Sequence, residues 1–538
     1  MKNGHKKHLN NDIIIKNGLI VDGTGKKPFL GNIYIKGKKI VSINKGDCLS
    51  VPYAKVIDLK KKKVIAPGFI DMHAHSDVSS FKTPSMESKV FQGITSEVIG
   101  NCGLTPAPAS EKNRNHLEDI YHIKDFLKNW KDFGSYLNNM NNTETCLNII
   151  PLVGHGTIHS FYLGYKEKDV SENIIERMRG KAMRSFLSGA WGVSFGLIYP
   201  PGCFTKKEEM TALFKEASKQ DVIVAVHMRD EGDHVEQALD ECLNIACNTK
   251  ARLHISHLKV FGKNNWKKIT SLLKKIREVR KKGIAVTADR YPYIASWTDL
   301  DTILPDFVYS KGHVNEIKLL KKKEEREKIK KIFYENKLYK NIEYFKSILI
   351  SQIRGSENKK YEGKTLYEIS LIEKKDPIDV VFDLLVASKL MVSAVFFGMD
   401  ERNMEKIIGE PYTVIGTDSS AKIFARSSGR PHPRSFGTFP RFFQHFVRNG
   451  KMSLEKGVRK CTGLTADIIG LKNRGYISSG YNADLVIFDI DSIEDTSTYM
   501  DPVSKPLGIE YVIVNGICVY VHGELTGKRS GNVIFKNK

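Results

Sequence analysis

Six residues of types that bind metal ions stand at or just beyond the ends of short apolar runs in this chain. They are His73, His75, Cys102, His227, His257 and Asp418. Histidine, cysteine and aspartate are suitable zinc ligands, and a zinc ion with an open coordination position can activate water. Metal-dependent hydrolysis is therefore the chemistry that these residue types favour, provided that the fold brings them together.

Two of the six form an HxH motif in the stretch "APGFIDMHAHSD", residues 66–77. Residues two apart on a strand point to the same face, so His73 and His75 are able to bind one ion. Taken singly, such a pair is a weak indication, and a lone cysteine is most often a small core residue. Six such residues in order along the chain are hard to explain as core packing. His254 lies three residues from His257 and should face differently, so we interpret it as structural.

The apolar runs that carry these residues alternate with amphipathic helical stretches through the middle of the chain. Starting at "GFIDMHAHSD" and ending at "YTVIGTDSS", about eight short strands follow this rhythm. Short buried strands alternating with helices indicate parallel βαβ units, here an α/β fold with a (β/α)₈ TIM-like barrel. The carboxyl ends of barrel strands converge on one mouth, where the six residues would meet.

Both ends of the chain have a different pattern, with short alternating strands separated by turn residues. We predict that residues 1–66 and 471–538 form one small β-sandwich and that residues 67–470 form the barrel between them. A charged helical insertion at about 298–344 interrupts the barrel after "DRYPY". It is expected at the barrel mouth, either as a lid or as a solvated excursion with no catalytic role.

The bulk composition is that of an ordinary globular protein. Its net charge of +23 comes from lysines dispersed along the chain, with no recognition-helix pattern, so we expect no nucleic-acid partner. Eight scattered cysteines indicate reduced thiols. No signal-peptide core and no long apolar span is visible, so we expect a cytoplasmic protein without membrane association. The sequence does not predict the oligomeric state.

Together these motifs resemble those of the amidohydrolase superfamily, and more closely those of the D-aminoacylases (N-acyl-D-amino-acid deacylases). The resemblance covers nearly the whole chain, through "DIIIKNGLIVDGTG", "GITSEVIGNCGLTPAP", "HMRDEGD", "HISHLK", "ADRYPY", "GRPHPRSFGTFPR" and "GYNADLVIFD". The segment "GNCGLTPAP" is the more specific signal. Many relatives bridge two metals with a carboxylated lysine, whereas D-aminoacylases have a cysteine in the metal site, which Cys102 matches.

The resemblance implies zinc-dependent hydrolysis of the amide bond of N-acyl-D-amino acids. It implies a tightly bound zinc ion on Cys102, His227 and His257 and a second, weaker site on His73, His75 and Asp418. Asp418 would also be the catalytic base, which accepts a proton from water and delivers it to the leaving amine.

The same resemblance implies a small-molecule N-acyl amino acid as the partner. Lys259, Arg430 and Tyr291, or alternatively its neighbour Tyr293, would bind the substrate carboxylate, and His155 would stabilise the oxyanion. An aliphatic or aromatic side chain is the default, because the sequence does not reveal the additional cations that an acidic substrate would need.

Two other functions compete with this interpretation. A dihydroorotase-like or hydantoinase-like enzyme would usually need the bridging lysine, and Cys102 argues against it. A basic binding protein that has lost catalysis would usually have lost a metal ligand, whereas this chain keeps all six candidates.

Overall fold

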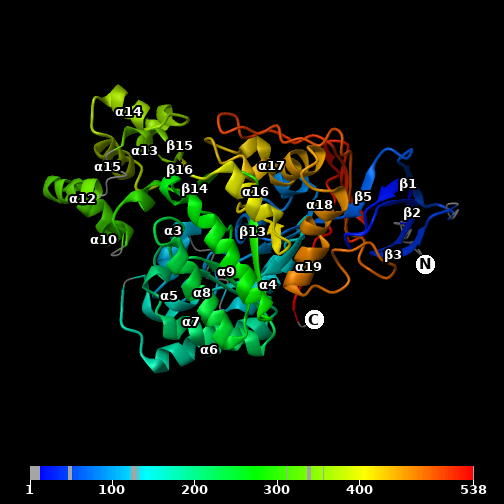
Figure 1. Cartoon of the computed structure of the whole chain (residues 1–538), viewed down its shortest axis with the longest axis horizontal. Helices are drawn as coiled ribbons and strands as arrows, with labels where there is room; N and C mark the ends of the chain where they lie inside the picture. The colour runs from blue at the N-terminus through cyan, green and yellow to red at the C-terminus, as the bar shows by residue number, and fades with distance from the viewer. Residues whose placement is uncertain are drawn as a thin grey trace, which may run out of the picture.

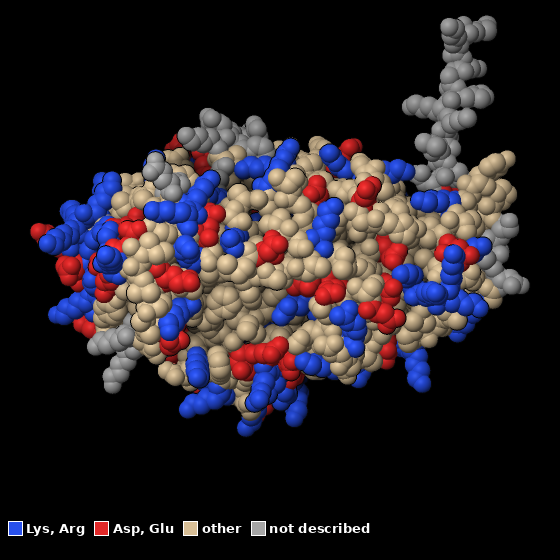
Figure 2. All heavy atoms as spheres, turned by 90° about the horizontal axis from the view of Figure 1, so that it is seen from above, with Lys and Arg blue, Asp and Glu red and all other residues tan. Residues whose placement is uncertain are grey.

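The protein consists of a central barrel with a terminal β-sheet at one end and an inserted α/β unit at the other (Figure 1). The computed structural model describes residues 12–46, 51–121, 123, 130, 132–165, 167–309, 312–335, 341–355 and 357–536. No helix in this described part is long and apolar enough to cross a membrane. Figure 2 shows basic and acidic side chains interspersed over one face.

Parallel strands in chain order build the barrel. In the described chain they are β6 (Phe69–Asp71), β7 (Ile94–Ile99), β8 (Asn148–Pro151) continued by β9 (Val153–Gly154), β10 (Gly192–Gly196), β11 (Ile223–His227), β12 (Arg252–Ile255), β13 (Val286–Arg290) and β17 (Thr413–Ile415). A parallel bridge between Ala74 and Ser419 closes the ring, next to a bond from the Met72 N–H to the Ile415 carbonyl. The predicted (β/α)₈ barrel is confirmed, with β8 and β9 counted as one strand.

Amphipathic helices cover the outside of the barrel. They include α6 (Glu172–Leu187), α7 (Lys207–Lys219), α8 (Val235–Thr249) and α9 (Ile269–Lys281), which lie side by side in Figure 1. In α7 the buried apolar residues are Met210, Leu213, Phe214 and Ala217. This spacing of three and four residues places them on one face of the helix, toward the strands.

The two ends of the chain meet in one sheet, as predicted. The N-terminal part supplies β1 (Ile13–Ile20), β2 (Phe29–Lys36), β3 (Lys39–Asn44), β4 (Lys55–Asp58) and β5 (Val64–Pro67). The C-terminal part supplies β18 (Leu485–Phe488), β19 (Ile509–Val514), β20 (Ile517–Val521) and β21 (Glu524–Leu525). Strands β5 and β18 pair antiparallel, with Leu485 opposite Pro67. Apart from β4, which pairs with β1 beside this path, the strands follow one hydrogen-bonded order, so the two chain ends share one sheet.

A Pro-Gly pair marks the passage from this sheet into the barrel. A Cβ atom on Gly68 would lie 2.1 Å from the Thr95 side chain, so only glycine fits there. The next residue, Phe69, is fully buried, and its ring lies 5.4 Å from that of Phe439 and 5.0 Å from that of Phe443. The aromatic cluster therefore anchors the first barrel strand at the junction.

The insertion is larger than the predicted segment 298–344 and is not purely helical. Its strands β14 (Ala295–Asp299), β15 (Ile348–Ile353) and β16 (Val392–Phe397) form an antiparallel sheet. Its helices include α11 (His313–Lys321), α12 (Lys323–Glu335), α14 (Leu366–Glu373) and α15 (Pro377–Ala387). The insertion has its own apolar core, in which Phe382 and Val392 are fully buried. None of these three strands was predicted, because the charged helices dominate the sequence pattern.

We predict that Phe69→Ala destabilises the protein by about 3–5 kcal/mol, because it removes a buried ring and leaves a cavity. Urea denaturation followed by tryptophan fluorescence measures this loss. Tyr53, which is 94% exposed, provides the matched control, and Tyr53→Ala should leave the transition unchanged. A denaturation midpoint that is equally unaffected in both variants would contradict the anchoring role of Phe69.

Candidate metal centre

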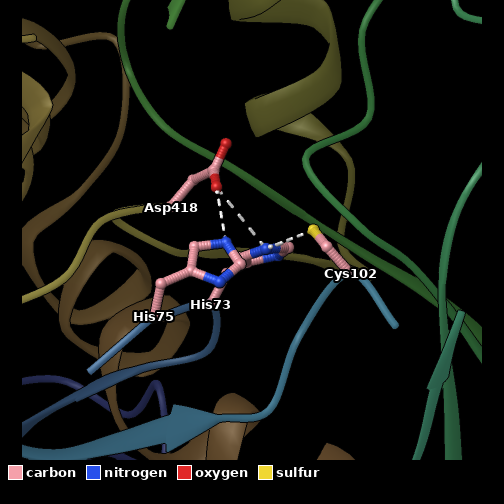
Figure 3. A group of neighbouring side chains, drawn as sticks. All are labelled: His73, His75, Cys102 and Asp418. Carbon is pink, nitrogen blue, oxygen red and sulfur yellow. Dashed lines mark hydrogen bonds and ion pairs between the residues drawn. The ribbon is translucent and has the colours of Figure 1, made fainter. Parts of the chain in front are cut away.

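The predicted metal ligands converge at the carboxyl ends of the barrel strands. The His73 Nε2 atom lies 3.2 Å from the Cys102 Sγ atom, which lies 3.6 Å from the His257 Nε2 atom. The His75 Nε2 atom lies 3.0 Å from the Asp418 Oδ1 atom. Figure 3 shows the side chains of His73, His75, Cys102 and Asp418 pointing toward one another. Residues separated by up to 345 positions in the sequence thus become neighbours.

These ligand atoms form two groups that share Cys102. One group is His73, His75, Cys102 and Asp418, and the other is Cys102, His227 and His257; within each group the ligand atoms lie within 4.8 Å of one another. Nitrogen, sulfur and carboxylate oxygen form a donor set that suits zinc. Both ring nitrogens of His227 are buried without a hydrogen-bond partner in the described structure, as expected of a side chain that awaits a metal. The residues present therefore fit one or two zinc ions.

Unusual backbone conformations aim three of these side chains inward. Cys102 has φ 54°, His257 has φ 34° and Asp418 has φ 49°, all in the left-handed region that most residues avoid. The Asp418 N–H donates to the His73 carbonyl at 2.7 Å, which ties the end of β17 to the HxH segment. Such conformations persist where surrounding contacts hold them, and they concentrate at functional sites.

The histidines and the thiol influence each other's protonation. Burial disfavours the Cys102 thiolate, but the charge on His73 and the hydrogen bond from His257 hold the thiol pKa well below its usual range. Burial and the Lys259 cation lower the pKa of His257, yet Glu231 and Asp418 raise it to about 9. The metal-free centre thus favours a thiolate beside imidazolium, and metal binding would release the protons on the histidines.

Asp289 on β13 orients two of the candidate ligands, His73 and His257, through hydrogen bonds. Its Oδ2 atom lies 3.1 Å from the His73 Nδ1 atom, so that the His73 Nε2 atom faces Cys102. Its Oδ1 atom accepts the backbone N–H of His257 at 3.0 Å, and His254 lies 3.0 Å from Oδ2. Carboxylates of this kind fix the tautomer and orientation of metal-binding histidines. The sequence signal that we missed is an acidic residue inside the apolar strand "IAVTADR".

A buried ion pair joins the first and last barrel strands beneath the centre. The Lys89 Nζ atom lies 2.8 Å from the Asp71 Oδ2 atom and donates to the Ser419 carbonyl at 2.8 Å. Asp71 also accepts the backbone N–H of Thr417 at 2.8 Å. Lys89 and Asp71 are both fully buried. The pair therefore holds the turn that carries Asp418 against the turn that carries the HxH motif.

Lys259 reaches the centre, as predicted, but it has a protein partner. Its Nζ atom lies 2.5 Å from the Glu231 Oε1 atom, which is also 3.1 Å from the His257 Nδ1 atom. Burial opposes ionisation of Glu231, and the charge on Lys259 overcomes it, so the Glu231 pKa falls below its usual range. Glu231, in "HMRDEGD", was not among the residues that we predicted.

The structure places Arg434 against the metal ligands, whereas Arg430, the predicted ligand of the substrate carboxylate, has other partners. The Arg434 Nη1 atom lies 2.8 Å from the Asp418 Oδ2 atom, and Arg434 is 4% exposed. In the described structure Arg430 donates instead to the carbonyl of Met500, at 2.5 Å, and to that of Ser351 through its backbone N–H. Arg434 begins helix α17 (Arg434–Phe442), and the structure thus assigns different partners to the two arginines of "GRPHPR".

The two tyrosines have different partners in the structure. Tyr291 is fully buried, its hydroxyl has no hydrogen-bond partner in the described chain, and the Arg434 guanidinium lies 4.8 Å from its ring centre. Burial raises the Tyr291 pKa, but Lys259 and the neighbouring arginines outweigh this and lower it. Tyr293 donates to Asp495 at 2.8 Å. Tyr291 is therefore the one of the two that faces the charged groups of the centre.

His155 lies in a separate buried group. Its Nε2 atom is 2.5 Å from the Glu209 Oε1 atom, which also lies 2.9 Å from the His159 Nδ1 atom. The ring of His155 stacks on Phe195. For the predicted oxyanion role, His155 would have to use its Nδ1 atom, which has no hydrogen-bond partner in the described structure. That role stays a prediction. Tyr199, which we did not predict, donates to the Cys102 carbonyl at 2.8 Å beside the centre.

Comparison with known proteins identifies the relatives of this chain. The pattern described as "Amidohydrolase family" matches residues 55–318 and 413–520. The D-aminoacylase of Alcaligenes xylosoxydans xylosoxydans is 31% identical over 97% of each chain. The zinc-bound N-acyl-D-glutamate deacylase of Bordetella bronchiseptica, in complex with a phosphonate inhibitor, superimposes with a TM-score of 0.81 at 27% identity, covering 97% of this chain and 99% of that one. A D-aminoacylase with a binuclear metal centre gives a TM-score of 0.80 at 29% identity and the same coverage.

We predict that Asp289→Asn weakens zinc binding by about 10- to 100-fold, as loss of an orienting carboxylate does at other metal sites. Competition with a chromophoric chelator measures the affinity. The control is Asp169→Asn, because Asp169 is fully exposed, and it should bind zinc like the wild type. Unchanged zinc affinity in Asp289→Asn would show that this carboxylate does not support the centre.

Proposed function

The chain belongs to the amidohydrolase family, and from this membership we propose that it hydrolyses the amide bond of N-acyl-D-amino acids to a carboxylate and a free D-amino acid. The observation that carries the proposal is the position of Cys102, whose sulfur lies between the two groups of ligands. Deacylases of such substrates are among the relatives at about 30% identity over nearly the full chain. The D-configuration is taken from these relatives.

We propose the zinc ligands that the resemblance to D-aminoacylases implies. Cys102, His227 and His257 would hold one ion tightly, while His73, His75 and Asp418 would hold a second one more weakly. When bound, zinc acts as a Lewis acid that activates water and polarises the amide carbonyl. The short distances from Cys102 Sγ to both histidine groups make this thiolate a candidate shared ligand.

Asp418 is the proposed catalytic base. One of its oxygens lies near His75 and the other pairs with Arg434, so the carboxylate is held at the mouth of the barrel. Burial disfavours its charged form, but Arg434 and His257 keep the Asp418 pKa well below its usual value. Asp418 is therefore ionised at neutral pH and able to accept the proton of the attacking water. The same carboxyl group would then deliver that proton to the leaving nitrogen.

Lys259, Tyr291 and Arg430 remain the proposed ligands of the substrate carboxylate. Lys259 and Tyr291 lie beside the metal ligands, and the free hydroxyl of Tyr291 is a suitable donor. Arg434 has a different proposed task. Because it pairs with Asp418 and donates to no substrate in this assignment, it is a positioning residue for the base.

The proposed reaction is tested with N-acetyl-D-amino acids, their L-enantiomers, hydantoin and dihydroorotate as substrates of the zinc-loaded protein. We expect free amino acid from the D-compounds, and a fall in kcat of about 10²- to 10⁴-fold in Asp418→Asn because the base is lost. Chromatography of the free amino acid and zinc analysis of each variant measure both quantities. Turnover near wild type in Asp418→Asn with zinc retained would refute the role of Asp418, and hydrolysis of the cyclic amides alone would refute the proposed substrate.

The two arginines of "GRPHPR" should differ in their kinetic effects. Arg430→Met is expected to raise KM by about 10-fold or more, because a charge-assisted contact with the substrate carboxylate is lost. Arg434→Met is expected to lower kcat instead, because Asp418 loses the partner that positions it. Steady-state kinetics with one N-acetyl-D-amino acid separates these effects. An unchanged KM in Arg430→Met would remove Arg430 from the carboxylate site.

A further inference from the structure

Lys422 lies at the barrel mouth, four residues after Asp418, on the loop that follows β17. Two backbone contacts fix this part of the loop. The Lys422 N–H donates to the Ser88 hydroxyl at 3.0 Å, and the Ser88 N–H donates to the Lys422 carbonyl at 3.0 Å. The side chain of Lys422 is half-buried. Paired hydrogen bonds therefore hold the Lys422 backbone against Ser88 of helix α2 (Glu87–Val90).

Trp297 of the insertion connects Lys422 to the centre. The Lys422 Nζ atom lies 5.2 Å from the centre of the indole ring, within the range of a cation–π contact. The carbonyl of the same tryptophan accepts a hydrogen bond from Arg434, which pairs with Asp418. The indole Nε1 donates to Ser351 at 2.7 Å, so the ring is fixed. One tryptophan residue thus separates the Lys422 ammonium group from the arginine that contacts the proposed base.

Three cationic side chains, Arg354, Lys89 and Arg434, lie close enough to Lys422 to repel its charge. Burial lowers its pKa most, and repulsion from Arg354, Lys89 and Arg434 adds to this, giving a pKa of about 8. Other buried cations nearby have carboxylate partners, as Lys89 has Asp71 and Lys259 has Glu231. Within the described chain, the Lys422 ammonium group forms no ion pair with a carboxylate. A partly buried cation among cations is unfavourable in the free protein, and an anion placed there would relieve the repulsion.

We propose that Lys422, supported by Trp297, binds a second carboxylate of the substrate, so that the enzyme prefers N-acyl-D-amino acids with an acidic group besides the α-carboxylate. This inference rests on the proposed deacylase function. The α-carboxylate already has Lys259, Tyr291 and Arg430 as its proposed ligands, and a substrate with one charge would leave Lys422 unpaired. Arg354, from the end of β15, adds positive potential from the insertion. We thus propose an acidic substrate in place of the aliphatic or aromatic one that was the default expectation from the sequence.

Two kinds of substrate carry the required second carboxylate. It can belong to the amino-acid side chain, as in N-acetyl-D-glutamate, or to the acyl group, as in N-succinyl-D-leucine. Their neutral counterparts are N-acetyl-D-glutamine and N-acetyl-D-leucine. The ratio of kcat/KM within each pair therefore measures the preference for the charge and distinguishes the two positions.

The zinc-loaded wild type is expected to prefer the acidic member of at least one pair by about 10- to 100-fold, the effect of one charge-assisted contact. Lys422→Met should reduce this ratio toward one by slowing the acidic substrate, while the neutral substrate changes by less than about 2-fold. Lys422→Arg should restore the preference, because it keeps the charge. The control Lys274→Met, at a lysine whose side chain is 74% exposed on α9, should behave like the wild type.

Three results would overturn the inference. A wild-type ratio near one for both pairs shows that the site does not select the second charge, while hydrolysis of the neutral substrates keeps the proposed function intact. An equal loss on acidic and neutral substrates in Lys422→Met assigns Lys422 to the α-carboxylate or to folding. If the zinc-loaded protein hydrolyses none of the four compounds, the proposed function and this inference are both wrong.

Discussion

The whole centre depends on the contacts of the buried Cys102 sulfur with the histidines around it. The sulfur lies 3.2 Å from the His73 nitrogen and 3.6 Å from the His257 nitrogen, so both groups of ligands include it. The thiol and the imidazoles lie so close together in a buried space that small displacements change the electrostatic energy between them. The surrounding carboxylates limit such displacements, because Asp289 fixes the rings of His73 and His254 and Glu231 fixes His257.

Closure of the barrel is the structural condition for this arrangement. The last strand, β17, must return to the first, β6, for Asp418 to meet the HxH segment, and the Lys89–Asp71 pair lies at that seam. A buried ion pair adds little net stability compared with apolar packing, but removal of one partner is costly. The pair is thus better understood as fixing one register of the seam than as a source of stability. The aromatic cluster at Phe69 supplies apolar packing at the start of the same strand.

The barrel framework and its six metal-type residues were predictable, because each such residue follows an apolar run and parallel strands place their carboxyl ends together. The contacts that we did not predict depend on which side chains become partners in the folded chain. Arg430 and Arg434 lie four residues apart in one motif, and only the start of helix α17 at Arg434 directs that side chain to Asp418. Asp289 and Glu231 look like ordinary charges in the sequence, although they contact ligands from distant strands. The strands β15 and β16 were hidden because the charged helices between them and β14 dominate the pattern.

The barrel and the insertion both contribute residues to the mouth. The barrel strands carry the metal ligands and the proposed base, whereas the insertion contributes Trp297 and Arg354 to the mouth. Around the centre, Lys89, Lys259 and Arg434 each neutralise a carboxylate of the protein, so their charges are already balanced. A metal ion held by the thiolate and imidazoles would add further positive charge to the same region. Lys422 has no carboxylate of this kind in the described structure, and this difference is the basis of the proposal that an anionic group of the substrate pairs with it.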